Sequence, residues 1–415
     1  MGEVWSNGQC RCKGRAVATT DFKAQEDDGM KMDVMVDGAR MTVKISGRLD
    51  VHTAPVLDEL IEHQLANIKE LMLDCGGVDS VSSVGLRAIL KAHQKMKDSH
   101  GRLLLKNVTK STADVFEVTG LDRILHCERK PRSMSVAGLQ MIAKGANGEC
   151  YKVDDETVLK LYFDYVEEAY AVKEKELAKQ AFVAGVPTPI SFDVVACGDR
   201  RGILYEMIRA DTLSKYIETN VDRFDEVVEL YVGFCKKIHA IVPAPNTFPD
   251  AVTLACGYVD ACDFFNERQR AFLKDRLVRT ERHGTLIHWD LHPSNIMRDG
   301  ENLCLIDMGD MAVGTPFFDL GQIKHVLHYC GGMGLCHTFI GLSDAIAVRV
   351  WKKFVASYFG HPAPDALAVI EENIEFYRAI KNVFLYLCRS GGETMRSRRK
   401  EFIFQMLPKE FAQLR

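Results

Sequence analysis

The sequence feature that most constrains the fold is a short polar run followed by an isolated acidic residue. The run is HWDLHPSN at residues 288–295, and DMG begins twelve residues after its end, at Asp307. Asp290 can accept or orient the proton of an attacking hydroxyl, while Asn295 and Asp307 offer the hard oxygens that Mg²⁺ prefers. The apolar residues 303–306 predict a strand that carries Asp307. The spacing therefore predicts a phosphoryl-transfer site, if the rest of the chain supplies a clamp for ATP.

Length and composition indicate a globular protein with more than one domain. The 415 residues exceed what one ordinary core organises, so two or three domains are expected. A content of 47% hydrophobic and 27% charged residues, with a net charge of −4, favours neither nucleic acid nor a membrane as partner. The sequence has no apolar stretch long enough to span a bilayer, and its thirteen cysteines lack zinc-ligand spacing. The thiols are therefore expected to be reduced, including those of the close pair Cys10 and Cys12. A cytoplasmic location is expected for the protein.

The first part of the chain predicts a leader followed by a small α/β domain. Residues 1–28 are polar and predict a flexible leader. Over residues 29–130 predicted strands alternate with predicted helices, which indicates a buried sheet. The strands are expected at 41–46, 71–74 and 103–105, and the helices after Pro55, from Ser82 or Ser83, and over 112–118. Pro131 and its charged neighbours predict the joint to the next domain at residues 130–133.

Three segments of this region resemble the STAS domain, which anti-sigma factor antagonists share with sulfate transporter tails. They are GRLD with the following Thr53 and Ala54, VSSVGLR at 81–87, and the closing element from Phe116 to Leu121. The resemblance covers roughly residues 32–127. It implies a regulatory phosphorylation site at Ser83, and a regulatory protein as a possible partner of the domain.

Two readings of the serine pair remain open. The STAS family usually has aspartate beside the modified serine, but this chain has Ser82 there, so both Ser82 and Ser83 are candidates. A phosphate at a helix N-terminus would meet free N–H groups and the positive end of the helix dipole. Alternatively, either serine serves only as the cap of its helix.

The predicted second domain, residues 131–415, opens with a turn suited to phosphates. Gly145, Asn147 and Gly148 lie between two predicted strands. Two glycines three residues apart let backbone amides approach a triphosphate, although hairpin turns without a ligand often have the same pattern.

A lysine and a glutamate in the next two predicted elements would complete the ATP clamp. Lys160 is the single lysine in the apolar strand 157–162, and in a kinase it would point inward to hold the α- and β-phosphates. The helix predicted from about 166 to 184 carries Glu174 and Glu176, either of which could pair with that lysine. The distance to the following GVPTP segment favours Glu174.

A predicted hairpin then ends in a stretch suited to a hinge. The backbone groups of Glu206 and Ile208 are expected to bind adenine, with Tyr205 and Met207 lining the pocket. The small lobe is expected over about residues 138–208. Helical periodicity dominates afterwards, which predicts a helical large lobe over about 209–415.

These segments occur in the order of the kinase-like fold, and the form HxDxHPxN resembles the aminoglycoside phosphotransferase and choline kinase family. The resemblance covers roughly residues 141–415. It implies an α+β protein-kinase-like two-lobed domain that follows the α/β STAS domain and uses ATP and Mg²⁺. Asp290 would be the catalytic base, Asn295 and Asp307 the metal ligands, Lys160 the phosphate ligand and Glu174 its positioning partner.

Three further residues of this domain are interpreted through the same resemblance. His288 would anchor the loop to the backbone around Asp307. Asp319 would cap a helix and order the large lobe. Trp289 stands where the family usually has glycine, and neither the protein-kinase arginine nor an Ala-Pro-Glu segment is found, so control by an activation loop is not expected.

Three functions remain as hypotheses. The leading one is an ATP-dependent phosphotransferase acting on the hydroxyl of a small-molecule alcohol and regulated through the STAS domain. The second is a protein serine kinase that acts on a STAS serine, such as Ser83 of its own chain or of a partner. The third is a non-catalytic nucleotide sensor that binds a partner protein. Resistance to aminoglycosides is not implied, because the region after Asp211 and the C-terminal region are mixed in charge.

Overall fold

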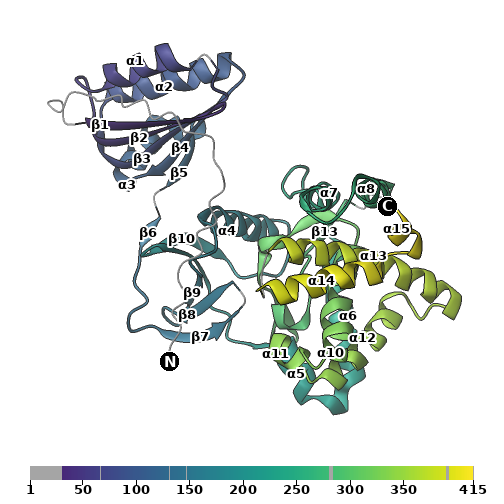
Figure 1. The fold of residues 1–415 in the computed structure, drawn as a ribbon. Coiled ribbons are helices and arrows are strands. Elements are labelled where there is room, and N and C mark those ends of the chain that lie inside the picture. Colours follow the sequence, from purple (N-terminus) through teal and green to yellow (C-terminus); the bar gives the residue numbers. More distant parts are fainter. Residues whose placement is uncertain are drawn as a thin grey trace, which may run out of the picture. The chain divides into compact units, whose positions relative to one another are not determined.

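The computed structural model describes residues 30–65, 67–129, 131–145, 147–279, 284–388 and 392–414 (Figure 1). The predicted leader and the pair Cys10 and Cys12 lie outside the described residues. Tertiary contacts divide the chain into two compact units, Met1–Arg132 and Ser133–Arg415. Each unit has hydrophobic core clusters of its own.

The first unit is a five-stranded sheet with helices on both faces. The strand order is β1-β2-β3-β4-β5, with β1 antiparallel to β2 and the remaining pairs parallel. Helices α1 and α2 lie on one face and α3 on the other (Figure 1). The strands are β1 (Met30–Asp37), β2 (Arg40–Leu49), β3 (Glu70–Val81), β4 (Arg102–Val108) and β5 (His126–Arg129), and the helices are α1 (Ala54–Gln64), α2 (Ser83–Asp98) and α3 (Lys110–Thr119). The predicted α/β fold of this domain is confirmed.

Two positions in this unit require glycine, Gly85 for close packing and Gly120 for its backbone conformation. A side chain at Gly85 would place its Cβ 2.3 Å from the carbonyl oxygen of Leu49, so only glycine lets α2 lie this close to β2. Gly120 ends α3 in the left-handed conformation, with φ of 71°, which favours glycine.

The second unit begins with an antiparallel sheet and one long helix. Its strand order is β6-β10-β11-β9-β8-β7, and α4 packs against β10 and β11. These elements are β6 (Arg132–Ser133), β7 (Gln140–Lys144), β8 (Gly148–Lys152), β9 (Thr157–Tyr162), β10 (Ser191–Cys197), β11 (Arg200–Glu206) and α4 (Glu168–Val183). They form the small lobe.

The rest of the second unit is mainly helical and forms the large lobe. Its helices are α5 (Leu213–Thr219), α6 (Phe224–His239), α7 (Ala251–Ala261), α8 (Glu267–Arg279), α9 (Phe317–Lys324), α10 (Cys330–Gly332), α11 (Cys336–Ile340), α12 (Asp344–Tyr358), α13 (Pro364–Leu387), α14 (Gly392–Met406) and α15 (Lys409–Gln413). Its short strands are β12 (Asp211–Thr212), β13 (Thr285–Ile287), β14 (Ile296–Asp299), β15 (Asn302–Leu305) and β16 (Ala312–Gly314). A β-rich lobe and a helical lobe confirm the predicted α+β kinase-like class.

Three short helical turns lie in or beside the polar segments of the large lobe. They are η3 (Pro293–Asn295), η4 (Met308–Asp310) and the π-helical turn η5 (His325–Tyr329), which continues α9. Such π-helical turns are rare and often occur at functional sites.

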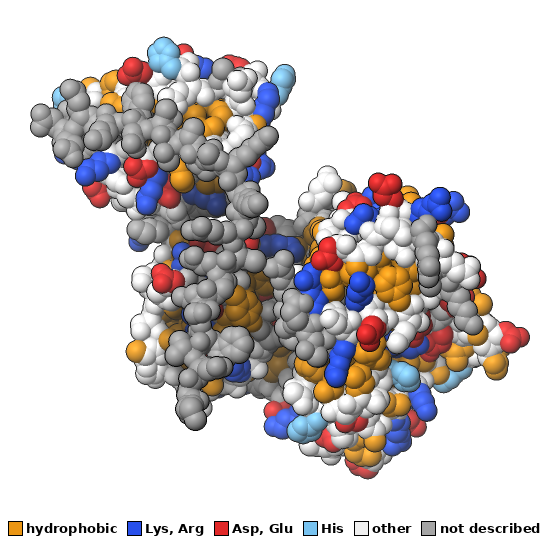
Figure 2. All heavy atoms as spheres, viewed as in Figure 1, with side chains coloured by type: hydrophobic (Ala, Val, Ile, Leu, Met, Phe, Trp, Pro, Cys, Tyr) orange, Lys and Arg blue, Asp and Glu red, His pale blue; other side chains and the backbone are white. Residues whose placement is uncertain are grey.

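Neither the face shown in Figure 2 nor the described cysteines indicate a site of their own. On the face shown in Figure 2, side chains of opposite charge are interspersed rather than separated by sign. The cysteines that the structure describes are free thiols. Among the described helices, none combines the length and the apolar character needed to cross a bilayer.

Candidate active site

The residues predicted to form an ATP clamp lie together around Lys160 on β9. Its Nζ lies 2.7 Å from Glu174 Oε1 and 2.8 Å from Asp307 Oδ1. Glu174, on α4, is completely buried, whereas Glu176 is half exposed and lies near Lys179 instead. The structure therefore brings together one residue from a strand of the small lobe, one from its helix and one from the large lobe.

Two tyrosines that the sequence did not indicate as its partners hold the Glu174 carboxylate. The hydroxyl of Tyr162 donates to Oε2, and that of Tyr205 donates to Oε1 over 3.0 Å. Burial raises the pKa of Glu174 above its ordinary value, and the opposite effect of Lys160 and the hydrogen bonds is smaller. Tyr205 was expected to line the nucleotide pocket, but its hydroxyl is used for this contact. The three donors give the buried carboxylate the partners that it needs.

Gly309 of the DMG segment is required by the packing around this ion pair. A Cβ at this position would lie 2.4 Å from the Tyr170 hydroxyl and 3.2 Å from Glu174 Oε2. The glycine therefore lets the turn after Asp307 lie against α4.

The glycine-rich turn has a structural explanation for one of its two glycines. A Cβ at Gly148 would lie 2.4 Å from the carbonyl oxygen of Leu161, so glycine is needed where β8 approaches β9. Gly145 has no such restriction, and its N–H donates to the Gly148 carbonyl over 2.9 Å. Asn147 is exposed, and its carbonyl accepts from the Phe163 N–H. The role of this turn in binding phosphates stays a prediction.

The hinge has one backbone donor available. The Glu206 N–H donates to Ile190 over 2.9 Å, and the Met207 N–H donates to Glu156 over 2.8 Å. Among the described residues, the Ile208 N–H has no backbone acceptor. Adenine recognition by the backbone groups of Glu206 and Ile208 stays a prediction.

Asp319 organises the start of the predicted catalytic loop, residues 288–295. Its carboxylate accepts from the backbone N–H of His288 over 2.9 Å and from that of Trp289, and it lies 2.9 Å from His239 Nε2. The residue is completely buried in the first turn of α9, but it makes no cap hydrogen bond to its own helix. The prediction that Asp319 caps a helix is therefore wrong, because its oxygens are taken by backbone donors of the catalytic loop.

The catalytic loop is tied to the strand that precedes Asp307. His288 Nε2 lies 3.1 Å from the carbonyl oxygen of Ile306, and the Ile306 N–H donates to the Asn295 carbonyl over 2.9 Å. Trp289 and Asp307 both have left-handed backbones, with φ of 61° and 67°. Non-glycine residues rarely adopt this conformation, and when they do they often lie at functional sites.

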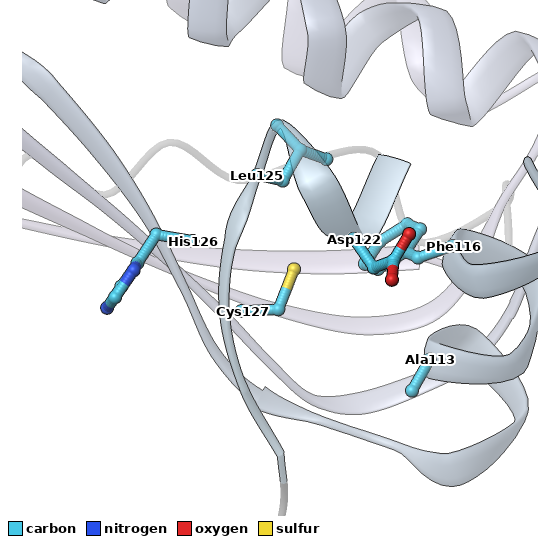
Figure 3. Close-up of a pocket in the computed structure, with 6 residues that line it drawn as sticks. All are labelled: Ala113, Phe116, Asp122, Leu125, His126 and Cys127. Carbon is cyan, nitrogen blue, oxygen red and sulfur yellow. The ribbon is translucent and has the colours of Figure 1, made fainter. Parts of the chain in front are cut away.

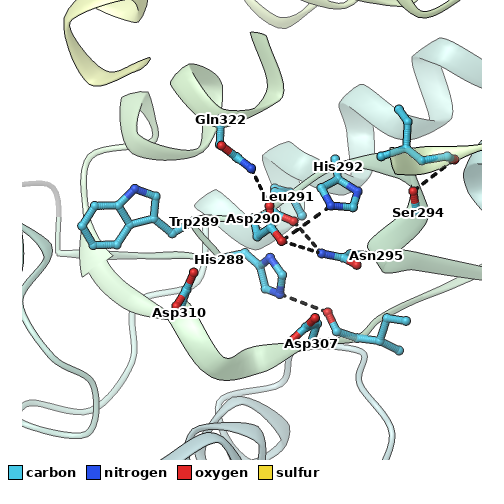
Figure 4. A network of polar contacts seen from close by, with 12 residues as sticks. His288, Trp289, Asp290, Leu291, His292, Ser294, Asn295, Asp307, Asp310 and Gln322 are labelled. Atoms are coloured by element: carbon cyan, nitrogen blue, oxygen red, sulfur yellow. Dashed lines mark hydrogen bonds and ion pairs between the residues drawn. The ribbon is translucent and has the colours of Figure 1, made fainter. Parts of the chain in front are cut away.

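The Asp290 carboxylate is surrounded by donors (Figure 4). Gln322 Nε2 lies 2.6 Å from Oδ1, while Asn295 Nδ2 and His292 Nε2 lie 3.2 Å and 3.5 Å from Oδ2. Burial alone would raise the pKa of Asp290. The lowering by His292, Lys381 and His288 is larger, so the pKa lies well below its ordinary value. The side chain is still 30% exposed. An ionised, accessible carboxylate of this kind suits a group that orients a hydroxyl.

Three residues around Asp290 were missed in the sequence. Gln322 lies three positions after Asp319 on α9, so helical spacing would have placed both on the side of the catalytic loop. Lys381 on α13 is 2% exposed, and its Nζ lies 3.1 Å from Asp310 Oδ2. His292 was noted only as part of the motif. No local pattern marks Lys381, because its partner is 71 residues away.

Asn295 and Asp307 could hold Mg²⁺. Asn295 Nδ2 donates to Asp290, which leaves its amide oxygen as the metal ligand, and the Asp307 side chain is 41% exposed. Within the described ranges, no cluster of three or more His, Cys, Asp or Glu residues could hold a metal. One amide and one carboxylate nevertheless fit Mg²⁺, which is usually bound by few protein groups together with substrate phosphates and water.

The two serines of the first unit have different environments. Ser82 is the N-cap of α2, and its Oγ accepts from the N–H groups of Val84 and Gly85 over 3.2 Å and 3.3 Å. Ser83 is the first residue of α2 and is exposed. Of the two candidates, Ser83 is therefore the one whose hydroxyl is not used by the cap.

A hollow of about 280 Å³ in the first unit contains none of the predicted site residues (Figure 3). It is lined by Ala113, Phe116, Asp122, Leu125, His126 and Cys127.

Comparison with known protein families assigns both units. The STAS domain family matches residues 31–134, and the phosphotransferase enzyme family matches residues 138–331. The anti-sigma-B factor antagonist of Bacillus subtilis (strain 168) is 28% identical over 101 residues, which are 24% of this chain and 93% of that protein.

Several solved structures are similar to parts of the chain. A thermostable mutant of aminoglycoside phosphotransferase APH(4)-Ia in its apo form is 13% identical, with a TM-score of 0.45, over 65% of this chain and 93% of that one. Amicoumacin kinase hAmiN in complex with AMP-PNP, Ca2+ and Ami is 14% identical, with a TM-score of 0.44, over 73% and 97%. An anti-sigma factor antagonist from Mycobacterium paratuberculosis is 24% identical, with a TM-score of 0.23, over 25% and 90%. By the two family matches, residues 31–134 form a STAS domain, and residues 138–331 that follow it form a domain of the phosphotransferase enzyme family.

Proposed function

We propose that the second domain transfers the γ-phosphoryl group of ATP to a hydroxyl of a small molecule. The observation that carries the proposal is the arrangement of four groups. Lys160 bridges Glu174 and Asp307, and the loop of the ionised Asp290 is hydrogen-bonded to the strand that precedes Asp307. Phosphoryl transfer needs a phosphate clamp, a metal site and a group that orients the nucleophile.

Each of these residues has one part in the proposed reaction. Lys160 binds the α- and β-phosphates, while Glu174 holds the lysine in place. The oxygens of Asn295 and Asp307 bind Mg²⁺, which supplies charge neutralisation at the phosphates. Asp290 orients the acceptor hydroxyl and receives its proton. Gln322 and His292 hold the carboxylate of Asp290 in position.

An ADP-release assay with alcohols, sugars and amino alcohols as acceptors tests the proposal. The intact protein should release ADP faster with some acceptors than with water, and Asp290→Ala should remove this acceleration. Asp299→Asn, at an exposed position at the end of β14, is the control and should behave like the wild type. If Asp290→Ala leaves turnover unchanged with every acceptor, the role of Asp290 is wrong.

For the STAS domain we propose a regulatory role, with a protein partner or a phosphorylated Ser83 as the signal. A second candidate function follows from this position, namely serine kinase activity toward Ser83 of the same chain or of a partner. The exposed Ser83 hydroxyl at the start of α2 favours it. A phosphate there would lie at the positive end of the helix dipole, where Ser82 Oγ already accepts from the N–H groups of Val84 and Gly85.

Incubation with labelled ATP followed by mass spectrometry tests the second candidate. Phosphate on Ser83 that is absent from a Ser83→Ala variant and from an Asp290→Ala variant would support it. Absence of label on both Ser82 and Ser83, alone and with an added STAS protein, would contradict it.

A further inference from the structure

A short segment of the small lobe lies across one face of its sheet. β6 and β7 are the edge strands of this sheet, and residues 134–139, called the connector below, join them. The Met134 N–H donates to the carbonyl oxygen of Ala196 on β10 over 2.8 Å. Two half-buried side chains of the connector, those of Met134 and Val136, pack against a cluster of buried apolar residues. The cluster consists of Leu159, Leu161, Val195 and Leu204.

The connector covers the face of the sheet opposite α4. Successive side chains of a strand point to opposite faces. On β9, Lys160 points toward Glu174 of α4, so Leu159 and Leu161 point away from that helix and toward the connector. β11 repeats the pattern, because Leu204 belongs to the same cluster while the residues on either side of it pack in the core that contains α4. The lysine of the predicted ATP clamp therefore lies between two leucines that contact the connector.

The position of β9 depends on support from both faces. On one face, Lys160 Nζ lies 2.7 Å from Glu174 and 2.8 Å from Asp307, and both contacts require the strand to stay in place. On the other face, Leu159 and Leu161 are 0% and 1% exposed. Without the connector these leucines would meet water, which is unfavourable. The strand would then gain from moving to positions that bury them in another way.

We propose that the connector is a positioning element of the ATP site, with Met134 and Val136 as its positioning residues. They hold β9 where Lys160 reaches the phosphates, and neither residue touches ATP. The proposal rests on the proposed use of ATP by the second domain. It extends the ATP site to residues that precede the phosphotransferase match, which begins at residue 138, and includes Met134, the last residue of the STAS match.

The fraction of molecules with an attached connector determines the kinetic signature. If only these molecules bind ATP, a smaller attached fraction raises the apparent Kd by the same factor. ATP at saturating concentration selects the attached state, so kcat stays unchanged while KM rises. A merely structural role would instead lower the amount of folded protein, and with it the apparent kcat, at an unchanged KM.

The double variant Met134→Ala/Val136→Ala of the full-length protein tests the proposal. Its Kd for ATP with Mg²⁺, measured by calorimetry, should rise by about tenfold, because small displacements of a positioning group are costly. The KM for ATP should rise equally, with kcat within about twofold of the wild type.

Two further double variants show whether the apolar contacts are responsible. Met134→Leu/Val136→Ile keeps apolar side chains of similar volume and should keep the Kd of the wild type. Met35→Ala/Val118→Ala is the matched control, because it makes the same changes in the first unit at side chains that are 53% and 88% exposed. It should behave like the wild type in every measurement.

Hydrogen exchange gives a readout that does not depend on turnover. Without nucleotide, the backbone amides of residues 157–162 should exchange faster in Met134→Ala/Val136→Ala than in the wild type, because their strand has lost the support of the connector. Addition of ATP with Mg²⁺ should restore much of the protection. Equal exchange of β9 in the variant and the wild type would show that the connector does not hold the strand.

The outcomes separate this proposal from the function on which it rests. If the wild type binds no ATP, the proposed function fails, whatever the exchange of β9 shows. If the wild type binds ATP and the folded alanine variant has the same Kd, the positioning role is overturned while the proposed function stands. Equal weakening by the leucine and isoleucine variant overturns it too. If the double alanine variant does not fold, Val136→Ala decides against Val118→Ala, with a rise in Kd of about threefold expected.

Discussion

At the scale of single residues, the conformation of Trp289 conflicts with its size. Its φ of 61° suits glycine, the residue usual at this place in the aminoglycoside phosphotransferase family, whereas a bulky residue is strained there. The indole is 2% exposed and packs against Phe318 and Tyr258, with ring centroids 4.8 Å and 5.9 Å apart. The packing of the ring therefore offsets the strain of its backbone.

Trp289→Gly measures these opposing effects. Removal of a buried tryptophan side chain costs about 3–5 kcal/mol, and relief of the backbone strain returns about 1–3 kcal/mol. We expect a net loss of about 2 kcal/mol in the free energy of unfolding, measured by urea denaturation. A glycine variant at least as stable as the wild type would show that the packing of the indole contributes little.

The two glutamates of α4 allow a matched comparison. Glu174→Gln removes the charge that holds Lys160, so the KM for ATP should rise by about tenfold or more, since a hydrogen bond to a charged group contributes about 1.5–3 kcal/mol. Glu176→Gln changes an exposed residue on the same helix and should leave the KM within about twofold. Steady-state kinetics with varied ATP distinguish the two, and equal effects would contradict the assignment of Glu174.

At the scale of elements, α9 and its π-helical continuation η5 form hydrogen bonds both to the loop of Asp290 and to α13. Asp319, Gln322 and His325 follow one another at intervals of three residues. The first bonds the catalytic loop, the second bonds Asp290, and His325 Nδ1 lies 3.3 Å from Asn382 Nδ2 on α13. This segment therefore links the catalytic loop to α13.

His325 should make stability depend on pH. Burial, Arg378 and Arg399 lower its pKa to about 3, so the folded protein keeps the ring neutral where the unfolded chain protonates it. The unfolded state then binds more protons between pH of about 3 and about 6.5, and the free energy of unfolding falls as pH drops through this window, by up to ~1.4 kcal/mol per pH unit.

The variant His325→Gln should flatten this dependence. The wild type should lose stability more steeply than the variant between pH of about 6.5 and the lowest pH at which unfolding stays reversible. His337→Gln, at an exposed position on α11, should keep the wild-type slope. Parallel slopes for wild type and His325→Gln in thermal unfolding would show that the ring is not held neutral.

Local patterns in the sequence predicted more of the elements than of their contacts. Alternating and helical periodicity placed the strand of Lys160 and the helix of Glu174, because each depends on residues close in sequence. The use of Asp319 was misjudged, since an aspartate at a helix start suggests a cap while its partners lie about thirty residues upstream. Gln322 and Lys381 acquire their meaning only when α9 and α13 pack beside the catalytic loop.

At the scale of the whole molecule, two units with separate cores imply separate responses to nucleotide. The residues proposed to bind ATP and Mg²⁺ all lie in Ser133–Arg415. A ligand at one hundred times its Kd stabilises its binding unit by about 2.7 kcal/mol. Calorimetry of the intact chain should show a transition that ATP with Mg²⁺ raises and a STAS transition that it leaves in place. A shift of both transitions together would contradict this independence.

The most direct test compares ATP binding and ATP turnover in the same Asp290→Asn variant. Asp290 acts on the acceptor hydroxyl in our account, so calorimetry should give a Kd for ATP with Mg²⁺ within about threefold of the wild type. Turnover with an accepted alcohol should fall by about 10²–10⁴-fold. Turnover equal to that of the wild type would contradict the account. Tight binding without turnover in the wild type itself would indicate a nucleotide sensor instead of a kinase.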